Sequence, residues 1–438
     1  MKRSRLFLVT LLGVALPSVA MASVTAGSPA VFGIHVEFVI FGLILLGIAL
    51  FHRRTFEVAV TGLVVLLAFK LAFTNFHLIR HFRNEWPMLL NLFGLLIGFA
   101  ILARHFEESK VPAEFPRWLP DDWKGGFVLL VFVFILSTFL DNIAAAMIGG
   151  AVAHVVYRHR VHIGFLAAIV AASNAGGAGS VIGDTTTTMM WIDGVAAGNV
   201  LHAFVGSAVS LLFFGIIASR QQQAYQPIVR DVPSGIRIDF GRVMIVVLIL
   251  TGAIAANILL EFPAVGVWIA ILIGATFRKT PWHELQKSLK GSLFLLALVT
   301  CASMMPVQDL PPASWKTAFG LGWISAVFDN IPLTKLALDQ GGYDWGFLAY
   351  AVGFGGSIIW FGSSAGVAIT NMFPEARSVF AWLKHAWHIP VGYLLGFFAM
   401  LWIMGWQPHA PHQRHGRFEK VPISSPRTDT ILNQRPRN

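Results

Sequence analysis

The sequence predicts an all-α, polytopic membrane protein, and three observations lead to that fold class. Hydrophobic residues make up 56% of the 438 residues and charged residues only 12%, whereas ordinary soluble domains carry about 25% charged residues. The mean hydropathy is +0.68. Apolar runs close to the length that crosses a bilayer recur along the chain, and we expect roughly ten to twelve membrane segments.

The expected membrane segments follow the apolar runs in chain order, and a polar loop at residues 221–240 divides them into two halves. The first half is residues 23–220 and the second half is residues 241–405. A basic tail at residues 406–438 is expected to be disordered. The clearest apolar runs are 31–51, 58–73, 88–103, 127–140, 196–218, 243–260, 265–277, 292–304 and 391–404.

Residues 1–22 have the features of a signal peptide. They begin with a basic stretch, continue through an apolar core and end on Ala20-Met21-Ala22, which is the order that a cleavable signal requires. After removal, the chain would start near Ser23 outside the cytoplasm and cross inward. The Arg53-Arg54 pair would then lie inside, as the positive-inside rule requires, and we expect a bacterial-type inner (plasma) membrane location.

The formal net charge of +10 is concentrated at the two ends of the chain. The first five residues hold three basic side chains, and the tail from Gln407 holds six basic residues against two acidic ones. Charge in these places fits membrane topology or lipid contact, so we expect the bilayer and no nucleic acid as a partner. The single cysteine, Cys301, excludes an internal disulfide and a cysteine-rich metal site, and no cofactor is expected.

The two halves resemble each other, which predicts a duplicated core. The segments "STFLDNIAAAMIGG" (137–150) and "SAVFDNIPLTKLALDQGG" (325–342) both place Asp-Asn-Ile a few residues after a serine. Further on, "NAGGAGSVIGDT" corresponds to "GFGGSIIWFGSS", with paired glycines 179 residues apart. Internal repeats are typical of secondary transporters, whose substrate sites lie where the repeats meet. The expected hairpin glycines are Gly176, Gly177, Gly183, Gly355, Gly356 and Gly362.

Each half is expected to contain a broken membrane helix. Residues 126–157 form one apolar run, which as a single helix would be about 48 Å long against a hydrocarbon core of about 30 Å. We expect the break at Asp141-Asn142, where free backbone groups and a carboxylate meet. In the second half, Pro332 follows Asp329 closely, and it should remove a helical hydrogen bond and break the second helix there.

Each half is also expected to contain a re-entrant hairpin, at residues 173–191 and 353–371. The first follows an apolar run of only half a span, and its glycines would let the chain turn back inside the protein. We expect its tip to carry Asn174, Ser180, Asp184 and the threonines 185–188. Carboxylate, amide, hydroxyl and free carbonyl oxygens are the ligands that a small hard cation prefers.

A buried carboxylate can hold either a proton or a metal ion. Burial favours the protonated form and a bound cation favours the ionised form, so Asp141 and Asp184 could serve both ions in turn, which is sufficient for antiport. Structural interpretations stay open beside this one. The aspartates could cap helix ends, the threonine hydroxyls could bond back to their own helix, and the glycine pairs could be small-residue helix contacts.

These motifs resemble the NhaD-type sodium/proton antiporters of the ion transporter superfamily, which also includes arsenite and di- and tricarboxylate carriers. The resemblance covers about residues 85–405, and "SNAGGAGSVIGDTTTTMMW" (173–191) is its most specific part. It implies a scaffold domain, a mobile transport domain built of inverted repeats, and a possible homodimer. The cation and proton site that it implies comprises Asp141, Asn174, Asp184, Thr186, Thr187, Asp329, Ser357 and Ser363, with Asp141 and Asp184 as the sodium ligands, and we count Asn142, which follows Asp141, with this site.

Lys335 keeps a second function open. It could pair with Asp339 one turn later, neutralise Asp329, or attract an anion, and the last option would favour an organic-anion or arsenite carrier. Sodium (or lithium)/proton exchange remains the leading hypothesis, because two buried carboxylates repel an anion. An intramembrane aspartyl protease is a remote alternative. The chain has no phosphate-binding loop or nucleophile motif, so we expect a secondary transporter rather than an enzyme.

Overall fold

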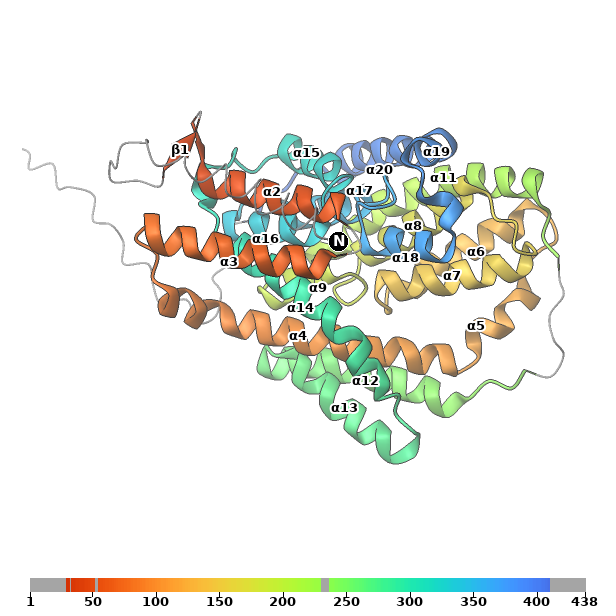
Figure 1. Cartoon of the computed structure of the whole chain (residues 1–438). Helices are drawn as coiled ribbons and strands as arrows, with labels where there is room; N and C mark the ends of the chain where they lie inside the picture. The colour runs from red at the N-terminus through yellow and green to blue at the C-terminus, as the bar shows by residue number, and fades with distance from the viewer. Residues whose placement is uncertain (1–28, 32, 52–53, 230–235, 410–438) are drawn as a thin grey trace, which may run out of the picture.

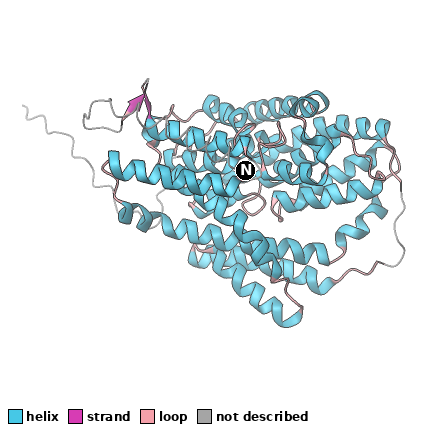
Figure 2. Ribbon diagram, viewed as in Figure 1, coloured by secondary structure: helices cyan, strands magenta, loops and turns pink. Residues whose placement is uncertain are grey.

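The computed structural model describes residues 29–31, 33–51, 54–229 and 236–409, and helices dominate these ranges (Figure 2). The predicted signal peptide and most of the tail lie outside the described residues. Two short strands, β1 (Ala30–Val31) and β2 (Ile34–His35), pair antiparallel before the first helix. The predicted all-α class is therefore confirmed for the described part of the chain.

The helices of the first half are α2 (Val36–Leu50), α3 (Thr55–Phe73), α4 (Leu78–Glu108), α5 (Val111–Glu114), α6 (Trp123–Leu136), α7 (Asn142–Val156), α8 (Ile163–Ala178), α9 (Thr185–Ile192), α10 (Ala197–Leu201) and α11 (Ala203–Tyr225). Those of the second half are α12 (Phe240–Leu260), α13 (Pro263–Phe277), α14 (His283–Ser303), α15 (Trp315–Ser325), α16 (Asn330–Gln340), α17 (Trp345–Gly355), α18 (Ser364–Met372), α19 (Val379–His385) and α20 (His388–Met404). Three short 3-10 helices are η1 (Phe115–Trp118), η2 (Val307–Asp309) and η3 (Pro374–Arg377).

The helices pack in two groups (Figure 1). Helices α2, α3, α4, α12, α13 and α14 form a peripheral bundle, in which α4 contacts α12, α13 and α14. Helices α6 to α11 and α15 to α20 form a central bundle around α8, which is buried along nearly its whole length. The two bundles meet where α14 contacts α16 and where α4 contacts α7 and α9.

The chain is a multi-pass membrane protein. Among the described residues, five helical segments are long and apolar enough to cross a membrane: Thr55–Phe73, Leu78–Glu108, Ala197–Tyr225, Phe240–Leu260 and His283–Ser303. A sixth is obtained if α19 and α20, which are bent by 60° at their junction, count as one span. Six further apolar helices have only 10–17 residues. The predicted ten to twelve segments are therefore reached only when these shorter helices are counted with the longer ones.

Both predicted helix breaks are present, but one predicted cause is wrong. Helix α6 ends at Leu136 and α7 begins after Asp141, while α15 ends at Ser325 and α16 begins after Asp329. Pro332 lies in the first turn of α16, where a backbone N–H has no partner within the helix. The proline is therefore tolerated at a helix start and does not itself cause the break.

The hairpin turns lie later than the sequence predicts. Helix α8 continues through Gly176 and Gly177 to Ala178, and α17 continues to Gly355. The chain turns over residues 179–184 in the first half and 356–363 in the second. Asn174 therefore lies on the last turns of α8 and not at the tip. These glycines do not bend the helix because they retain helical backbone angles, and their missing side chains serve packing instead.

Candidate functional site

Asp141 and Asp329 occupy the same position in the two halves of the central bundle. Each is the residue before a helix, and each carboxylate accepts a hydrogen bond from the backbone N–H two residues later, at 3.3 Å for Ile143 and 3.0 Å for Ile331. The backbone angles of the two residues agree within a few degrees. The helix-capping interpretation of these aspartates is thus present in the structure, and it leaves further carboxylate lone pairs for other ligands.

The two hairpins also match in their caps. In the first hairpin, Asp184 Oδ1 accepts a hydrogen bond from the Thr186 N–H at 3.2 Å at the start of α9. In the second, Ser363 Oγ accepts one from the Gly366 N–H at 3.3 Å at the start of α18. The first half therefore carries a carboxylate where the second carries a hydroxyl.

The hairpin glycines allow the hairpins to approach the broken helices closely. A Cβ atom on Gly176 would overlap the Phe134 carbonyl oxygen of α6, and one on Gly355 would overlap the Gly322 carbonyl oxygen of α15. Gly183 packs in the same way against the Ser137 carbonyl. Equivalent glycines thus make equivalent backbone contacts in the two halves. The remaining glycines also match. Gly177 packs against Gly183 as Gly356 packs against Gly362, and Gly362 packs against the carbonyl oxygens of Ser325 and Ala326.

A buried hydrogen-bond network connects the first broken helix to both hairpins. Asn142 Nδ2 donates to Asn174 Oδ1 at 3.0 Å. Asn174 Nδ2 in turn donates to Ser357 Oγ at 2.9 Å and to Ser363 Oγ at 3.1 Å. All four side chains are buried. Four of the residues that the sequence predicts are therefore in direct contact, although they lie up to 221 residues apart along the chain.

Asp184 is the carboxylate closest to the centre of this arrangement. It is only 3% exposed, its Oδ2 accepts a 3.4 Å hydrogen bond from Asn330 Nδ2, and its charge acts on both Asp141 and Asp329. The structure thus brings together the three predicted acidic residues, although each comes from a different helix start.

The two predicted threonines differ in their surroundings. Thr187 Oγ1 donates within the hairpin, where the carbonyl oxygens of Ser180 at 2.6 Å and Asp184 at 2.9 Å accept. Thr186 Oγ1 is buried and donates to no backbone carbonyl of the described residues, and its hydroxyl interacts with the Asp184 carboxylate. Thr187 therefore closes the hairpin, as the structural interpretation of the threonines expects, and the Thr186 hydroxyl beside Asp184 is the better candidate ligand.

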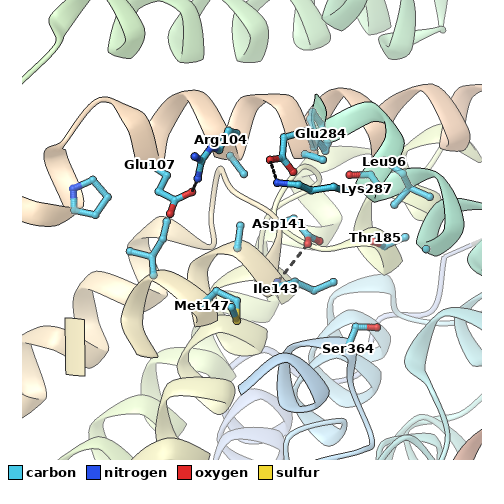
Figure 3. A pocket seen from close by; sticks show the side chains of 18 of the residues that line it. Leu96, Arg104, Glu107, Asp141, Ile143, Met147, Thr185, Glu284, Lys287 and Ser364 are labelled. Atoms are coloured by element: carbon cyan, nitrogen blue, oxygen red, sulfur yellow. Dashed lines mark hydrogen bonds and ion pairs between the residues drawn. The ribbon is translucent and has the colours of Figure 1, made fainter. Parts of the chain in front are cut away.

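A cavity of about 960 Å³ leads to these carboxylates from between the two bundles. Asp141, Asp184 and Thr185 line its floor together with Ser364, and α4 and α14 form its other wall (Figure 3). Charged residues line the wall near the ends of these helices, and two pairs are bonded there: Arg104 with Glu107, and Lys287 with Glu284 at 2.8 Å. The carboxylates are thus accessible from one end of the molecule through this cavity.

The carboxylate cluster offers oxygen ligands, and the Met147 side chain lines the cavity near it. Among the described residues, no group of three or more His, Cys, Asp or Glu side chains is arranged to hold a metal ion. Carboxylate, hydroxyl and backbone oxygens suit a hard cation that binds weakly enough to leave again.

Lys335 lies away from the carboxylate cluster and is fully paired. Its ammonium contacts Asp339 Oδ1 at 2.6 Å and Glu85 Oε2 at 3.1 Å, and its side chain has no exposed surface. The predicted pairing with Asp339 is therefore present. The two carboxylates offset its positive charge, which leaves little to attract an anion.

Two residues of functional interest were missed by sequence reasoning. Asn330 contacts Asp184, and it follows Asp329 as Asn142 follows Asp141, so the repeat itself could have identified it. Glu85 lies on α4, far from Lys335 along the chain, and only its position as a buried acid in an apolar helix could have drawn attention to it.

Sequence comparison shows that the chain is similar to curated antiporters. Sodium/proton antiporter 1 of Arabidopsis thaliana is 29% identical over 298 residues, covering 57% of this chain and 50% of that protein. The Na(+)/H(+) antiporters NhaD of Alkalimonas amylolytica and Vibrio parahaemolyticus are each 26% identical, over 64% and 62% of this chain and 69% and 78% of their own lengths. The chain is related in sequence to NhaD-type sodium/proton antiporters.

This relationship confirms the resemblance that the motifs indicate. The chain spans about half the length of the first plant relative and about two thirds or more of the bacterial NhaD proteins. No protein-family model matches the chain. The relatives are transporters by name and not enzymes.

Proposed function

We propose that this protein is a secondary active transporter that exchanges sodium (or lithium) for protons across a bacterial-type inner membrane. The observation that carries the proposal is the position of Asp141 and Asp184 at the floor of a cavity, with Asp329 and a buried amide and hydroxyl network beside them. Ionisable groups at membrane depth are expensive to bury and indicate function by default. The names of the relatives support the same activity.

The proposed mechanism is competition for the same carboxylates. With no cation bound, burial favours the protonated form of Asp141 and Asp184, and sodium entering the cavity displaces those protons. Asp184 supplies a carboxylate ligand, and the buried hydroxyl of Thr186, two residues later in the chain, lies beside it. Asn142, Asn174, Ser357 and Ser363 hold the hairpin ends in place, and Asp329 adds a third titratable group.

We propose that the cavity opens to the cytoplasm. It is reached at the end where α4, α7 and α11 end and where α6 and α12 begin (Figure 1). Contacts between Asp239 and Arg278 and between Arg220 and Trp123 connect these helix ends. Arg104, Lys110 and Lys287 line the cavity, and Arg158, Arg160, Arg220 and Arg242 lie in or beside the helix ends that meet there, whereas Lys70, Arg80 and Arg83 lie at the end of α3 and the start of α4. An excess of Lys and Arg is typical of the cytoplasmic side.

The pairing of Lys335 weighs against the anion alternative. The residue that kept a carboxylate or arsenite carrier open is Lys335, and it faces two acidic partners instead of an open site. The protease alternative has no support from the relatives, which are named as transporters. Sodium/proton exchange therefore explains the site better than either alternative.

Transport by purified protein in proteoliposomes tests the proposal. Under an imposed pH gradient, we expect added sodium to drive proton movement that a trapped pH dye reports, and we expect Asp184→Asn to abolish it. Asp309→Asn is the matched control, because Asp309 pairs with His35 at the opposite end and is 42% exposed. Uptake of labelled citrate or succinate that is lost in Lys335→Ala would instead establish the anion carrier.

The organisation of the chain is part of the same proposal. We propose a signal peptide at residues 1–22, two related membrane halves at 23–220 and 241–405, a connecting loop at 221–240, a basic tail at 406–438 and assembly as a homodimer. The matching glycine contacts of the two hairpins support the duplication. Light scattering of the purified protein in detergent measures the oligomeric state, and the mass of the purified protein shows whether the signal peptide is removed.

A further inference from the structure

Among the described residues, Glu85, Lys335 and Asp339 form a cluster of three buried charges that the proposed exchange does not use. The Lys335 side chain has no exposed surface, and its two partners are 7% and 10% exposed. Lys335 and Asp339 belong to α16 of the central bundle, and Glu85 belongs to α4 of the peripheral bundle. The cluster is thus a charged link between the two bundles.

This cluster lies on the opposite side of the carboxylates from the cavity. Helix α16 starts at the site, where Asn330 contacts Asp184, and runs away from it to Lys335 and Asp339. Its last residue, Gln340, donates to the Pro311 carbonyl oxygen at 2.7 Å, in the loops at the end that carries the strands (Figure 1). Of the described residues, none from α16 lines the cavity, and α4 lines it only from Leu92 onward.

A layer of buried apolar side chains begins at Leu336, the residue after Lys335. Leu336 of α16 packs with buried residues of α14, including Leu298 and Cys301. The Cys301 thiol lies in this layer with no exposed surface. A transporter that works by alternating access must open the side that is closed here. This layer, and the charged link between α4 and α16, must therefore separate during that step.

We propose that Glu85, Lys335 and Asp339 form a latch that holds the closed side of the transporter shut, by joining α4 to α16 while the cavity is open at the other end. The inference rests on the proposed transport function, because only alternating access requires the layer to open. The three residues act by positioning α16 and do not bind the transported ions. Removing one partner from a buried ion pair is strongly destabilising, so single variants should release the latch.

The sole cysteine of the chain reports the state of the latch directly. A membrane-impermeant thiol reagent is applied to the full-length protein in spheroplasts and in everted vesicles, and the rate of Cys301 labelling is measured by mass. The wild-type protein should react slowly from both sides. Lys335→Met and Glu85→Gln should each raise the rate at least about tenfold from the latch side only. Lys290→Met is the matched control, because Lys290 pairs with Glu57 in an exposed position at the other end.

A charge swap distinguishes a latch from a general packing defect. The double variant Glu85→Lys with Lys335→Glu keeps one basic and two acidic groups in the same place, and it should return the Cys301 labelling rate toward the wild-type value. The proposal is overturned if folded Lys335→Met or Glu85→Gln protein labels at the wild-type rate, or if labelling rises equally from both sides. If Lys335→Met does not fold, Glu85→Gln decides on the same criterion.

The two proposals fail in different ways. Faster labelling on release of the latch, in a protein that does not exchange sodium for protons, would contradict the proposed function and keep the latch. Normal exchange by the wild-type protein, with unchanged Cys301 labelling in both variants, would contradict the latch and leave the proposed function standing.

Discussion

A glycine substitution where the second hairpin meets α15 tests how the site is assembled. An alanine at Gly355 would place its Cβ over the carbonyl oxygen of Gly322 in α15. A backbone oxygen cannot rotate away as a side chain can, so one helix must shift. Such overpacking costs about 1–3 kcal/mol, which outweighs the gain of about 0.5–1 kcal/mol that alanine brings to a helix in place of glycine.

The measurement is the thermal midpoint of the purified protein in detergent, with Gly320→Ala as the matched control. Gly320 lies in α15 itself, and a Cβ there would have no atom within 4 Å. We expect Gly355→Ala to lower the midpoint and to weaken sodium-dependent exchange, whereas Gly320→Ala should leave both unchanged or slightly raise the midpoint. If both variants behave alike, close backbone contact between hairpin and broken helix does not organise the site.

Four further substitutions give distinct expected outcomes. Asn174→Ala removes three buried hydrogen bonds. We expect the free energy of unfolding to fall by about 1–3 kcal/mol in a denaturation experiment, together with weaker activation of exchange by sodium. Unchanged stability and exchange would show that the network is not part of the site. Thr187→Val should lower the thermal midpoint, whereas Thr186→Val should mainly raise the sodium concentration needed for exchange, and equal effects of the two would contradict their different surroundings. The hydrogen bond from Arg278 lowers the pKa of Asp239 below its usual value. The ionised Asp239 carboxylate therefore stabilises the folded protein above about pH 4, and this stabilisation is lost as the pH falls further. In Asp239→Asn, the thermal midpoint should therefore depend less on pH in this acid range, and an unaltered acid profile would exclude the contribution.

Much of the fold follows from local patterns that the sequence displays. The break at Asp141 is predictable because an apolar run too long for the bilayer contains one carboxylate, and the second break follows from the same Asp-Asn-Ile motif at Asp329. The acidic and polar residues of the site are predictable because burying them in a membrane segment is costly without a function.

Other features depend on contacts between distant segments. The turn of the first hairpin comes after Gly177 because Gly176 accommodates the α6 backbone and Gly177 accommodates the Gly183 backbone, and neither glycine bends α8. Glu85 could not be assigned to Lys335 from sequence, because they lie 250 residues apart on helices of different bundles. The predicted role of Pro332 in breaking the helix is wrong for a related reason. Its position in the first turn of α16 depends on the helix starting directly after Asp329.

Proton release on sodium binding tests the central claim most directly. Purified protein in weakly buffered detergent solution is mixed with sodium chloride, and a pH dye reports the protons that leave the protein. If Asp184 and Asp141 hold either ion, sodium should release protons in the wild-type protein, choline chloride should release none, and the double variant Asp184→Asn with Asp141→Asn should show no release. Sodium-dependent proton release that persists undiminished in this double variant would contradict the account.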